Sequence, residues 1–351
     1  MTISRRDFLL AGSTLAAATL IAPRAWARRQ PVLQPPTTRQ VNPGETRYFE
    51  WKKAADGVQV AFGEGGNALV MVGKDGALLI DTKNCGFGET LRKEAVSFGS
   101  LLALVINTHH HADHTGGNCA FTGDVAVLAH TKAKPRIAAN VPRYISGAKS
   151  TVSTLFKSNK LSARGVRESA MKLAGTLDEL KDPQKVAALF EPTKTTEGNE
   201  TLTVGGKKVE LAHVGPGHTD NDLIVFLPES NVLHTGDLVF HKWWPYIDRA
   251  GGADTAGWIR SCEKILTLCN DKTVVVPGHG DITDKSGVQG QIDFFKKMRD
   301  AAAKAVKDGV TRDAFIAMPF EDYKGFAEAS NFIRPVTLGG LYDEAAGTPA
   351  Q

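Results

Sequence analysis

The sequence predicts an α/β fold, in which short apolar strands alternate with helices and present polar side chains along one shared rim. Three observations lead to this prediction. Leu101–Ile106 is an unbroken apolar run, which fits a strand buried on both faces. The segment 107–118 follows it and packs four imidazoles and one carboxylate into residues 109–114. Three later apolar runs each end at Gly or Pro before a His or an Asp.

The segment 107–118 is predicted to be a metal site, because ligands in open α/β sheets bind beyond the carboxyl ends of the strands. His109 and His111 alternate, so both rings can face one ion while His110 points elsewhere. Asp113 and His114 add a second pair of donors. Imidazoles with a carboxylate suit zinc or another borderline first-row ion. The alternative is a histidine-rich surface loop, which the downstream motifs disfavour.

Those downstream motifs share one arrangement. The apolar run 211–214 leads into Gly-Pro-Gly-His218, the run 231–233 leads into Thr-Gly-Asp237, and the run 273–276 leads into Pro-Gly-His279. Strands that end at a common edge would bring these three side chains to the histidine cluster.

With these motifs the sequence resembles the metallo-β-lactamase superfamily, whose pattern is His-x-His-x-Asp-His followed by His, Asp and His in that order. The resemblance spans roughly residues 58–300 and implies a four-layer αβ/βα sandwich with two metals in a cleft. It implies a glyoxalase II-like set of seven ligands. His109, His111 and His218 would hold the first metal, Asp113, His114 and His279 the second, and Asp237 would bridge them.

The remaining elements are expected in the following order. An antiparallel meander occupies 58–62, 68–72 and 77–81, where alternating or apolar runs are separated by Gly-rich turns. A helix at 88–98 precedes the central strand, and a further strand at 125–129 follows the metal segment. Helices are expected at 254–269, with Asp254 as the amino-terminal cap, and at 285–307.

Residues 1–27 read as a targeting peptide. Arg5 and Arg6 form a twin-arginine signature, an apolar stretch follows, and 25–27 reads Ala-Trp-Ala, a cleavage pattern. We expect the twin-arginine export machinery as a partner and a periplasmic or secreted location. The apolar stretch is short for a membrane span, so no stable span is expected in the mature form, although an uncleaved anchor is the alternative. Residues 28–50 read as a linker and 51–351 as one domain.

Two stretches are candidates for the substrate pocket. Residues 141–195 break the rhythm of short strands and read as a helical insertion, which is either a lid over the cleft or a passive excursion. Lys242, Trp243, Trp244 and Tyr246 follow the expected bridging Asp237 closely and could line the pocket, whereas ordinary core packing is the alternative for the Trp pair.

The charge of the chain argues against one class of partner. The formal charge is +4, and loss of three arginines and one aspartate with residues 1–27 takes it to +2. Lys and Arg are scattered, so no nucleic-acid partner is expected.

Cys262 and Cys269 lie on one predicted helix ~10 Å apart, too far for a disulfide. Cys85 and Cys119 are favoured as buried thiols over a disulfide. Three further histidines are expected to be structural: His130, His213 and His234.

The implied chemistry is hydrolysis by a metal-bound hydroxide. Two zinc ions per chain would lower the pKa of a shared water, and Asp113 would orient it and shuttle its proton. The expected substrate is a small molecule with an ester, lactone, thioester or β-lactam bond. The main alternative is an oxidoreductase of the same fold, a persulfide dioxygenase with a single iron. A non-catalytic metal-binding protein is a third alternative.

Overall fold

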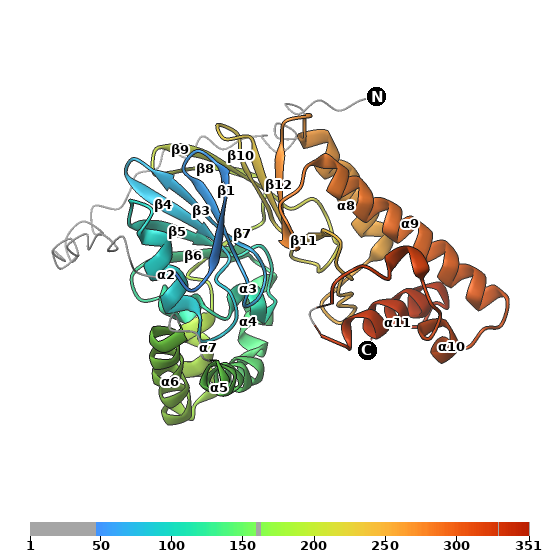
Figure 1. The fold of residues 1–351 in the computed structure, drawn as a ribbon, viewed down its shortest axis with the longest axis horizontal. Coiled ribbons are helices and arrows are strands. Elements are labelled where there is room, and N and C mark those ends of the chain that lie inside the picture. Colours follow the sequence, from blue (N-terminus) through green and yellow to red (C-terminus); the bar gives the residue numbers. More distant parts are fainter. Residues whose placement is uncertain (1–46, 159–162, 329, 351) are drawn as a thin grey trace.

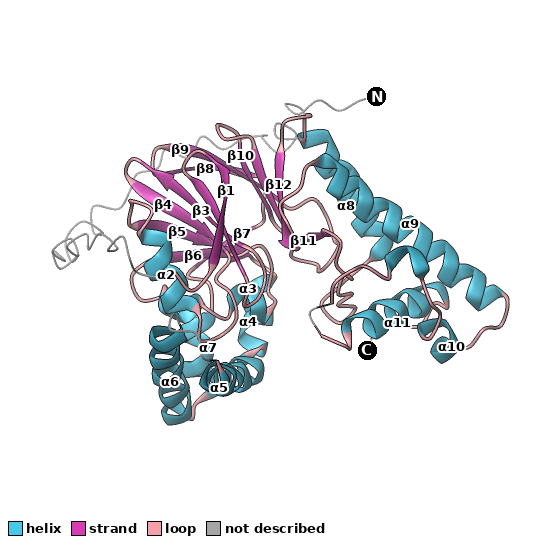
Figure 2. Cartoon of the chain, in the orientation of Figure 1, coloured by secondary structure: helices cyan, strands magenta, loops and turns pink. Residues whose placement is uncertain are grey.

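The computed structural model describes residues 47–158, 163–328 and 330–350. Two β-sheets adjoin in the middle, and helices lie on the outer side of each (Figures 1 and 2). The predicted four-layer αβ/βα sandwich is confirmed. The expected targeting peptide and most of the expected linker fall in residues 1–46, which lie outside the described residues.

The first sheet has seven strands in sequence order from β1 to β7. Neighbours are antiparallel from β1 to β4 and parallel from β4 to β7. Its strands are β1 (Glu50–Ala55), β2 (Val58–Phe62), β3 (Ala68–Gly73), β4 (Gly76–Ile80), β5 (Leu102–Ile106), β6 (Ala126–His130) and β7 (Lys194–Thr196). The expected meander is therefore present, with β1 as an additional edge strand.

The second sheet has five strands in the order β12-β11-β10-β9-β8. Only the β11–β12 pair is parallel. Its strands are β8 (Glu200–Val204), β9 (Lys207–Ala212), β10 (Ile224–Leu227), β11 (Val232–Phe240) and β12 (Val274–His279).

The helices fall into two groups. On the side of the first sheet lie α2 (Gly88–Val96), α3 (Ala112–Thr115), the 3-10 turn η2 (Asn118–Ala120), α4 (Ala133–Ala139), α5 (Val141–Lys157), α6 (Ala163–Leu180) and α7 (Pro183–Phe190). On the side of the second sheet lie α8 (Thr255–Leu268), α9 (Lys285–Lys307), α10 (Arg312–Ile316), the 3-10 turn η3 (Glu321–Tyr323) and α11 (Ile333–Ala345). Asp254 caps α8 as expected, because its carboxylate accepts from the backbone N–H of Ala256 at 3.0 Å.

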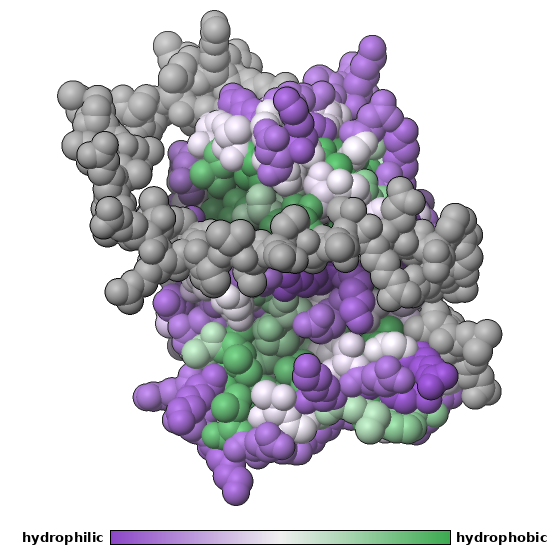
Figure 3. All heavy atoms as spheres, turned by 90° about the vertical axis from the view of Figure 1, so that its left-hand side faces the viewer, coloured by the Kyte–Doolittle hydropathy of each residue, from purple (hydrophilic) through white to green (hydrophobic). Residues whose placement is uncertain are grey.

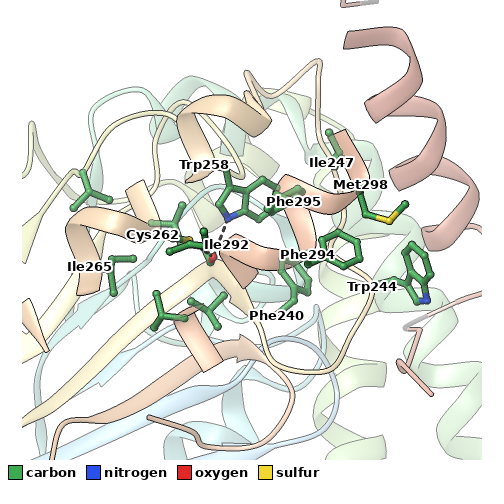
Figure 4. Packing of buried hydrophobic residues seen from close by; sticks show 14 of the residues in the cluster. Phe240, Trp244, Ile247, Trp258, Cys262, Ile265, Ile292, Phe294, Phe295 and Met298 are labelled. Atoms are coloured by element: carbon green, nitrogen blue, oxygen red, sulfur yellow. Dashed lines mark hydrogen bonds between the residues drawn. The ribbon is translucent and has the colours of Figure 1, made fainter. Parts of the chain in front are cut away.

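The core is divided by the sheets. Inward-facing residues such as Met71, Leu78 and Val225 pack between the two sheets. The outer face of the second sheet carries an aromatic core, in which Trp258 packs against Phe295 with ring centroids 4.5 Å apart (Figure 4). The Trp258 indole also donates to a backbone carbonyl of β11 at 2.8 Å, so α8 is held against the strand that carries Asp237.

Three sequence-based expectations need correction. The central strand is not buried on both faces along its whole length, because Leu101 is 49% exposed and only Val105 and Ile106 are fully buried. The expected boundary at residue 51 is too late: Phe49 is buried in the core, and β1 begins at Glu50. The strands that carry Asp237 and His279 do not stop before these residues, since β11 and β12 run through them.

The surface over the insertion carries apolar residues among hydrophilic ones, visible on the lower half of the face in Figure 3. Phe156 on α5 and Met171 on α6 are 57% and 49% exposed. Of the helices in the described ranges, none combines the length and the hydropathy that a membrane crossing requires.

Candidate metal centre

The histidine-rich segment turns immediately beyond the carboxyl end of β5. His111 has an extended backbone and is the N-cap of the one-turn helix α3, which begins at Ala112. This bend sends His109 and His111 to one side and Asp113 and His114 to the other, so the local sequence supplies two separate groups of donors. His109, His111 and His114 are all at most 5% exposed.

The first group contains His109, His111, His218 and Asp237. Nδ1 of His111 lies 3.1 Å from Nε2 of His109 and 2.8 Å from Nε2 of His218. Oδ2 of Asp237 lies 3.4 Å from Nε2 of His218 and 3.8 Å from Nε2 of His109. Four donor atoms therefore converge on one small volume, which suits a four-coordinate ion.

The second group contains Asp113, His114 and His279. Oδ2 of Asp113 lies 3.2 Å from Nε2 of His279 and 3.6 Å from Nε2 of His114. Asp237 reaches this group as well, with Oδ1 3.0 Å from Nε2 of His114 and Oδ2 3.4 Å from Nε2 of His279. The structure thus brings all seven expected residues together, and Asp237 is the side chain that both groups share.

Asp237 reaches both groups because β11 is irregular there. The register between β11 and β12 shifts on both sides of Gly236, which has a φ of +52°. Such a bulge re-aims side chains that regular pairing would send to one face. The partner strand must also lack a side chain here, because a Cβ on Gly278 would lie 1.9 Å from Oδ1 of Asp237.

The nitrogens that face away from the groups are hydrogen-bonded, which orients the rings. Nε2 of His111 lies 2.8 Å from Oδ2 of Asp248, and Nδ1 of His114 lies 2.7 Å from Oδ2 of Asp81. Nδ1 of His218 donates to the Tyr246 carbonyl at 2.9 Å. Each ring thereby keeps its other nitrogen free to bind a metal, which is the usual arrangement of metal-binding histidines.

The motif analysis missed Asp81 and Asp248, whose carboxylates contact two of the expected ligand histidines. Asp81 directly follows the apolar strand β4, so the same rule that found Asp237 could have found it. Asp81 has a positive φ of 61°. Its carboxylate also accepts two hydrogen bonds from Thr108, one from the backbone N–H and one from the hydroxyl, each at 2.8 Å. This strained backbone has a cost on the order of 1 kcal/mol, which is tolerated at sites where a side chain must be aimed.

The donor set fits metal ions. Nε2 of His114 and Oδ1 of Asp237 are buried, and within the described part of the chain neither has a hydrogen-bond partner. Buried polar atoms are rarely left unsatisfied, and a cation between these two would satisfy both. Gly66 packs closely against the His114 ring. Any side chain at position 66 would clash with it, because a Cβ there would lie 2.0 Å from Cε1 of His114.

The electrostatics of the cluster favour positive charge. Burial works to raise the pKa of Asp237, yet the imidazoles of His114 and His279 hold it well below its usual range. Burial works to lower the pKa of His279, but the carboxylates of Asp237 and Asp113 raise it to about 9. The carboxylates therefore favour a cation at the point where the donors meet.

The four expected pocket residues lie in different places. The Trp243 ring is half-buried with its centroid 5.7 Å from that of His279, and the Tyr246 ring lies 5.5 Å from that of His111. Lys242 is exposed beside them. Trp244 does not line a pocket: it is 3% exposed and packs edge-on against Phe294 in the core (Figure 4).

The other histidines lie outside the two groups. His130 and His213 pack against each other with ring centroids 4.6 Å apart, and Nε2 of buried His234 lies 3.1 Å from the Asn67 carbonyl oxygen. His110 points away from His109, as expected, and Nε2 lies 3.5 Å from Oδ2 of Asp248. Cys85 and Cys119 are free thiols, the first buried and the second partly exposed.

The insertion is helical, and its first and last helices both contact the metal segment. The Tyr144 hydroxyl on α5 lies 2.8 Å from the Thr115 hydroxyl, and the Phe190 carbonyl on α7 accepts from the Asn118 side chain at 2.8 Å. Asn140, just before the insertion, donates to the His110 carbonyl at 3.0 Å. By contrast, α6 packs against α5 and α2. A cavity of about 990 Å³ lies between α5 and α7, lined by residues such as Ile145 and Ala187.

The comparisons decide the family. A family model described as the metallo-beta-lactamase superfamily matches residues 61–279, more than half of the 351 residues. The chain belongs to the metallo-beta-lactamase superfamily. Its ligand residues come together in this fold, and with the superfamily relatives they support a metal-dependent hydrolase.

Other superfamily members resemble the chain at low identity. The metallo-beta-lactamase type 2 of Bacillus sp. (strain 170) is 25% identical over 235 residues, which cover 66% of this chain and 72% of that protein. The enzyme of the same name from Bacillus cereus is 24% identical over 235 residues, 66% of this chain and 73% of that protein. The solved metallo-beta-lactamase from Pontibacter korlensis has a TM-score of 0.53 at 20% identity and covers 71% of this chain and 99% of that one. This solved structure shares the fold of the chain.

Proposed function

We propose that the protein is an exported hydrolase that uses two zinc ions per chain to cleave an ester, lactone, thioester or β-lactam bond in a small molecule. One observation carries this proposal: seven donor side chains form two groups, and Asp237 belongs to both. Imidazole-rich sites with a shared carboxylate suit zinc. Two zinc ions held there would supply an activated water and polarise the scissile carbonyl.

The two carboxylates of the centre are suited to different tasks. The Asp237 side chain is 3% exposed and surrounded by imidazoles, so it can only hold the centre together. The Asp113 side chain is 31% exposed, so solvent and substrate can reach it. We therefore assign to Asp113 the orientation of the attacking water and the acceptance of its proton. No Ser or Cys nucleophile is required.

Aromatic side chains on the two sides of the centre support an apolar substrate. Tyr246 lies beside the first group and Trp243 beside the second, and exposed Lys242 adds a positive charge next to Trp243. Phe332, at the start of α11, is 57% exposed and lies 6.5 Å from the Tyr246 ring. Large aromatic surfaces beside a reactive site favour substrates with apolar acyl groups.

The proposed location rests on the amino-terminal sequence alone. The twin-arginine signature of residues 1–27 supports transport by the twin-arginine machinery to the periplasm or the medium. This export route carries folded proteins, which suits a protein that binds its metals before it leaves the cytoplasm.

The test is metal analysis combined with an activity panel. The purified protein is expected to contain about two zinc ions per chain and to hydrolyse at least one of a panel of esters, lactones, thioesters and β-lactams. Chelation should abolish this activity, and added zinc should restore it. His130→Gln, a histidine outside the centre, is the control and should keep both metals. One iron per chain with oxygen consumption on a persulfide would instead establish the dioxygenase.

A further inference from the structure

Asp248 is a partly buried carboxylate that contacts two of the three consecutive histidines. Its Oδ2 lies 2.8 Å from Nε2 of His111 and 3.5 Å from Nε2 of His110. Its Oδ1 accepts from the backbone N–H of Gly251 at 2.8 Å. The side chain is only 15% exposed, so these contacts take the place of water.

The contacts continue from His110 to the protein surface. Nδ1 of His110 lies 3.0 Å from the Asn221 amide, which donates to Asp220 at 2.9 Å. Arg136 on α4 then forms a two-pronged ion pair with Asp220, at 2.7 and 3.1 Å. Arg136 also donates to the Ala250 carbonyl at 3.1 Å, which closes the network onto the loop that carries Asp248.

The network determines which nitrogen of His111 faces the first metal group. A neutral imidazole has one N–H and one lone pair. When Nε2 donates its proton to Asp248, the lone pair is on Nδ1, the atom that lies beside His109 and His218. Without that acceptor, either tautomer of the ring is available and its orientation is no longer fixed.

We propose that Asp248 is the positioning residue of the first metal site, and that His110, held by Asn221, keeps the Asp248 carboxylate in place. Asp81 has the same relation to His114 in the second site. Each metal therefore has its own orienting carboxylate. This inference rests on the two-metal function proposed above, but it concerns the geometry of metal binding and not the choice of substrate.

The test compares Asp248→Asn with Asp81→Asn in zinc titrations against a chromophoric chelator. Each change keeps the side-chain volume and removes the carboxylate. Asp248→Asn is expected to weaken the first site by about 10- to 100-fold and leave the second unchanged, and Asp81→Asn to do the reverse. To assign the weakened site, Asp248→Asn is combined with each of two further changes. Asp113→Ala should leave only the first site, and His218→Ala should leave only the second.

A second readout does not need metal. Long-range proton–nitrogen NMR spectra of the metal-free protein are expected to show His111 protonated on Nε2, and a mixed tautomer in Asp248→Asn. If Asp248→Asn folds poorly, Asp248→Glu serves in its place: it retains the carboxylate and should keep most of the affinity. His110→Gln should weaken the first site by less than Asp248→Asn does, because its contact is longer.

Three results would overturn the inference: equal weakening of both sites, unchanged affinity with an unchanged tautomer, or loss of a third metal equivalent in Asp248→Asn. The last would mean that His110, His111 and Asp248 hold an ion themselves. Failure of the wild-type protein to hydrolyse any substrate would refute the proposed function and leave these binding measurements valid.

Discussion

Replacing Asp237 with alanine should weaken both metal sites together. The carboxylate lies 3.4 Å from the donor nitrogen of His218 in one group and 3.0 Å from that of His114 in the other. Its loss removes a ligand and a negative charge from each. By contrast, Asp113 contacts only the second group, so Asp113→Ala should chiefly empty that site.

The magnitude can be worked through the effect of metal on stability. A metal present at 1,000 times its dissociation constant stabilises the folded protein by about 4.1 kcal/mol per site. If the loss of Asp237 weakens each site about 100-fold, the same metal concentration contributes only about 1.4 kcal/mol per site. The loss is then on the order of 5 kcal/mol for two sites. In a domain of this size, each kcal/mol moves the melting temperature by about 2–4 °C.

The assay measures metal content by elemental analysis and melting temperature with and without a chelator. For Asp237→Ala we expect less than one metal per chain after dialysis, and the increase in melting temperature on zinc addition should shrink by about 10 °C or more. Normal metal content in Asp237→Ala would refute the bridging role. Selective loss of one metal would mean that the carboxylate serves a single site.

Three further predictions concern other parts of the chain. Burial lowers the pKa of Lys83 to about 7 against the opposing effect of nearby carboxylates. Above pH 7 the unfolded state therefore binds more protons than the folded state. Between pH 7 and 9 the unfolding free energy of the wild type, measured with denaturant, should rise relative to that of Lys83→Met by up to about 1.4 kcal/mol per pH unit. Parallel pH profiles of the two proteins would contradict this. Phe332→Ala should raise KM several-fold for bulky apolar acyl substrates but not for acetyl substrates. Phe156 is equally exposed at 57%, so Phe156→Ala is the control and should leave KM unchanged for both classes of substrate. Replacement of Arg5 and Arg6 with Lys should hold the precursor in the cytoplasm, as measured by cell fractionation; unchanged export would remove the twin-arginine prediction.

The convergence of the ligand side chains was the most predictable part of the molecule. An apolar run that stops at Gly or Pro is a local signal, and the positions of His218 and His279 followed from it. The same reasoning assumed that such a run ends the strand. It therefore missed that β11 continues through Asp237, because a bulge depends on pairing with another strand.

Contacts between distant segments could not be predicted from one sequence. Trp243 and Trp244 are neighbours of the same type, yet one lies beside His279 and the other in the core beneath α9. Only the tertiary packing distinguishes them. Likewise, nothing local marks Asp248 as the partner of His111, since 137 residues separate them.

The carboxylates of the assembled centre favour the binding of cations there. Four carboxylates contact the metal-site imidazoles, those of Asp81, Asp113, Asp237 and Asp248, and two of them are at most 3% exposed. Buried carboxylates are costly unless positive charge compensates them. Two divalent cations would bring four positive charges to the same volume. With both cations bound, the two orienting carboxylates would also complete the balance of charge, so we expect the folded geometry of the site to depend on its metal occupancy.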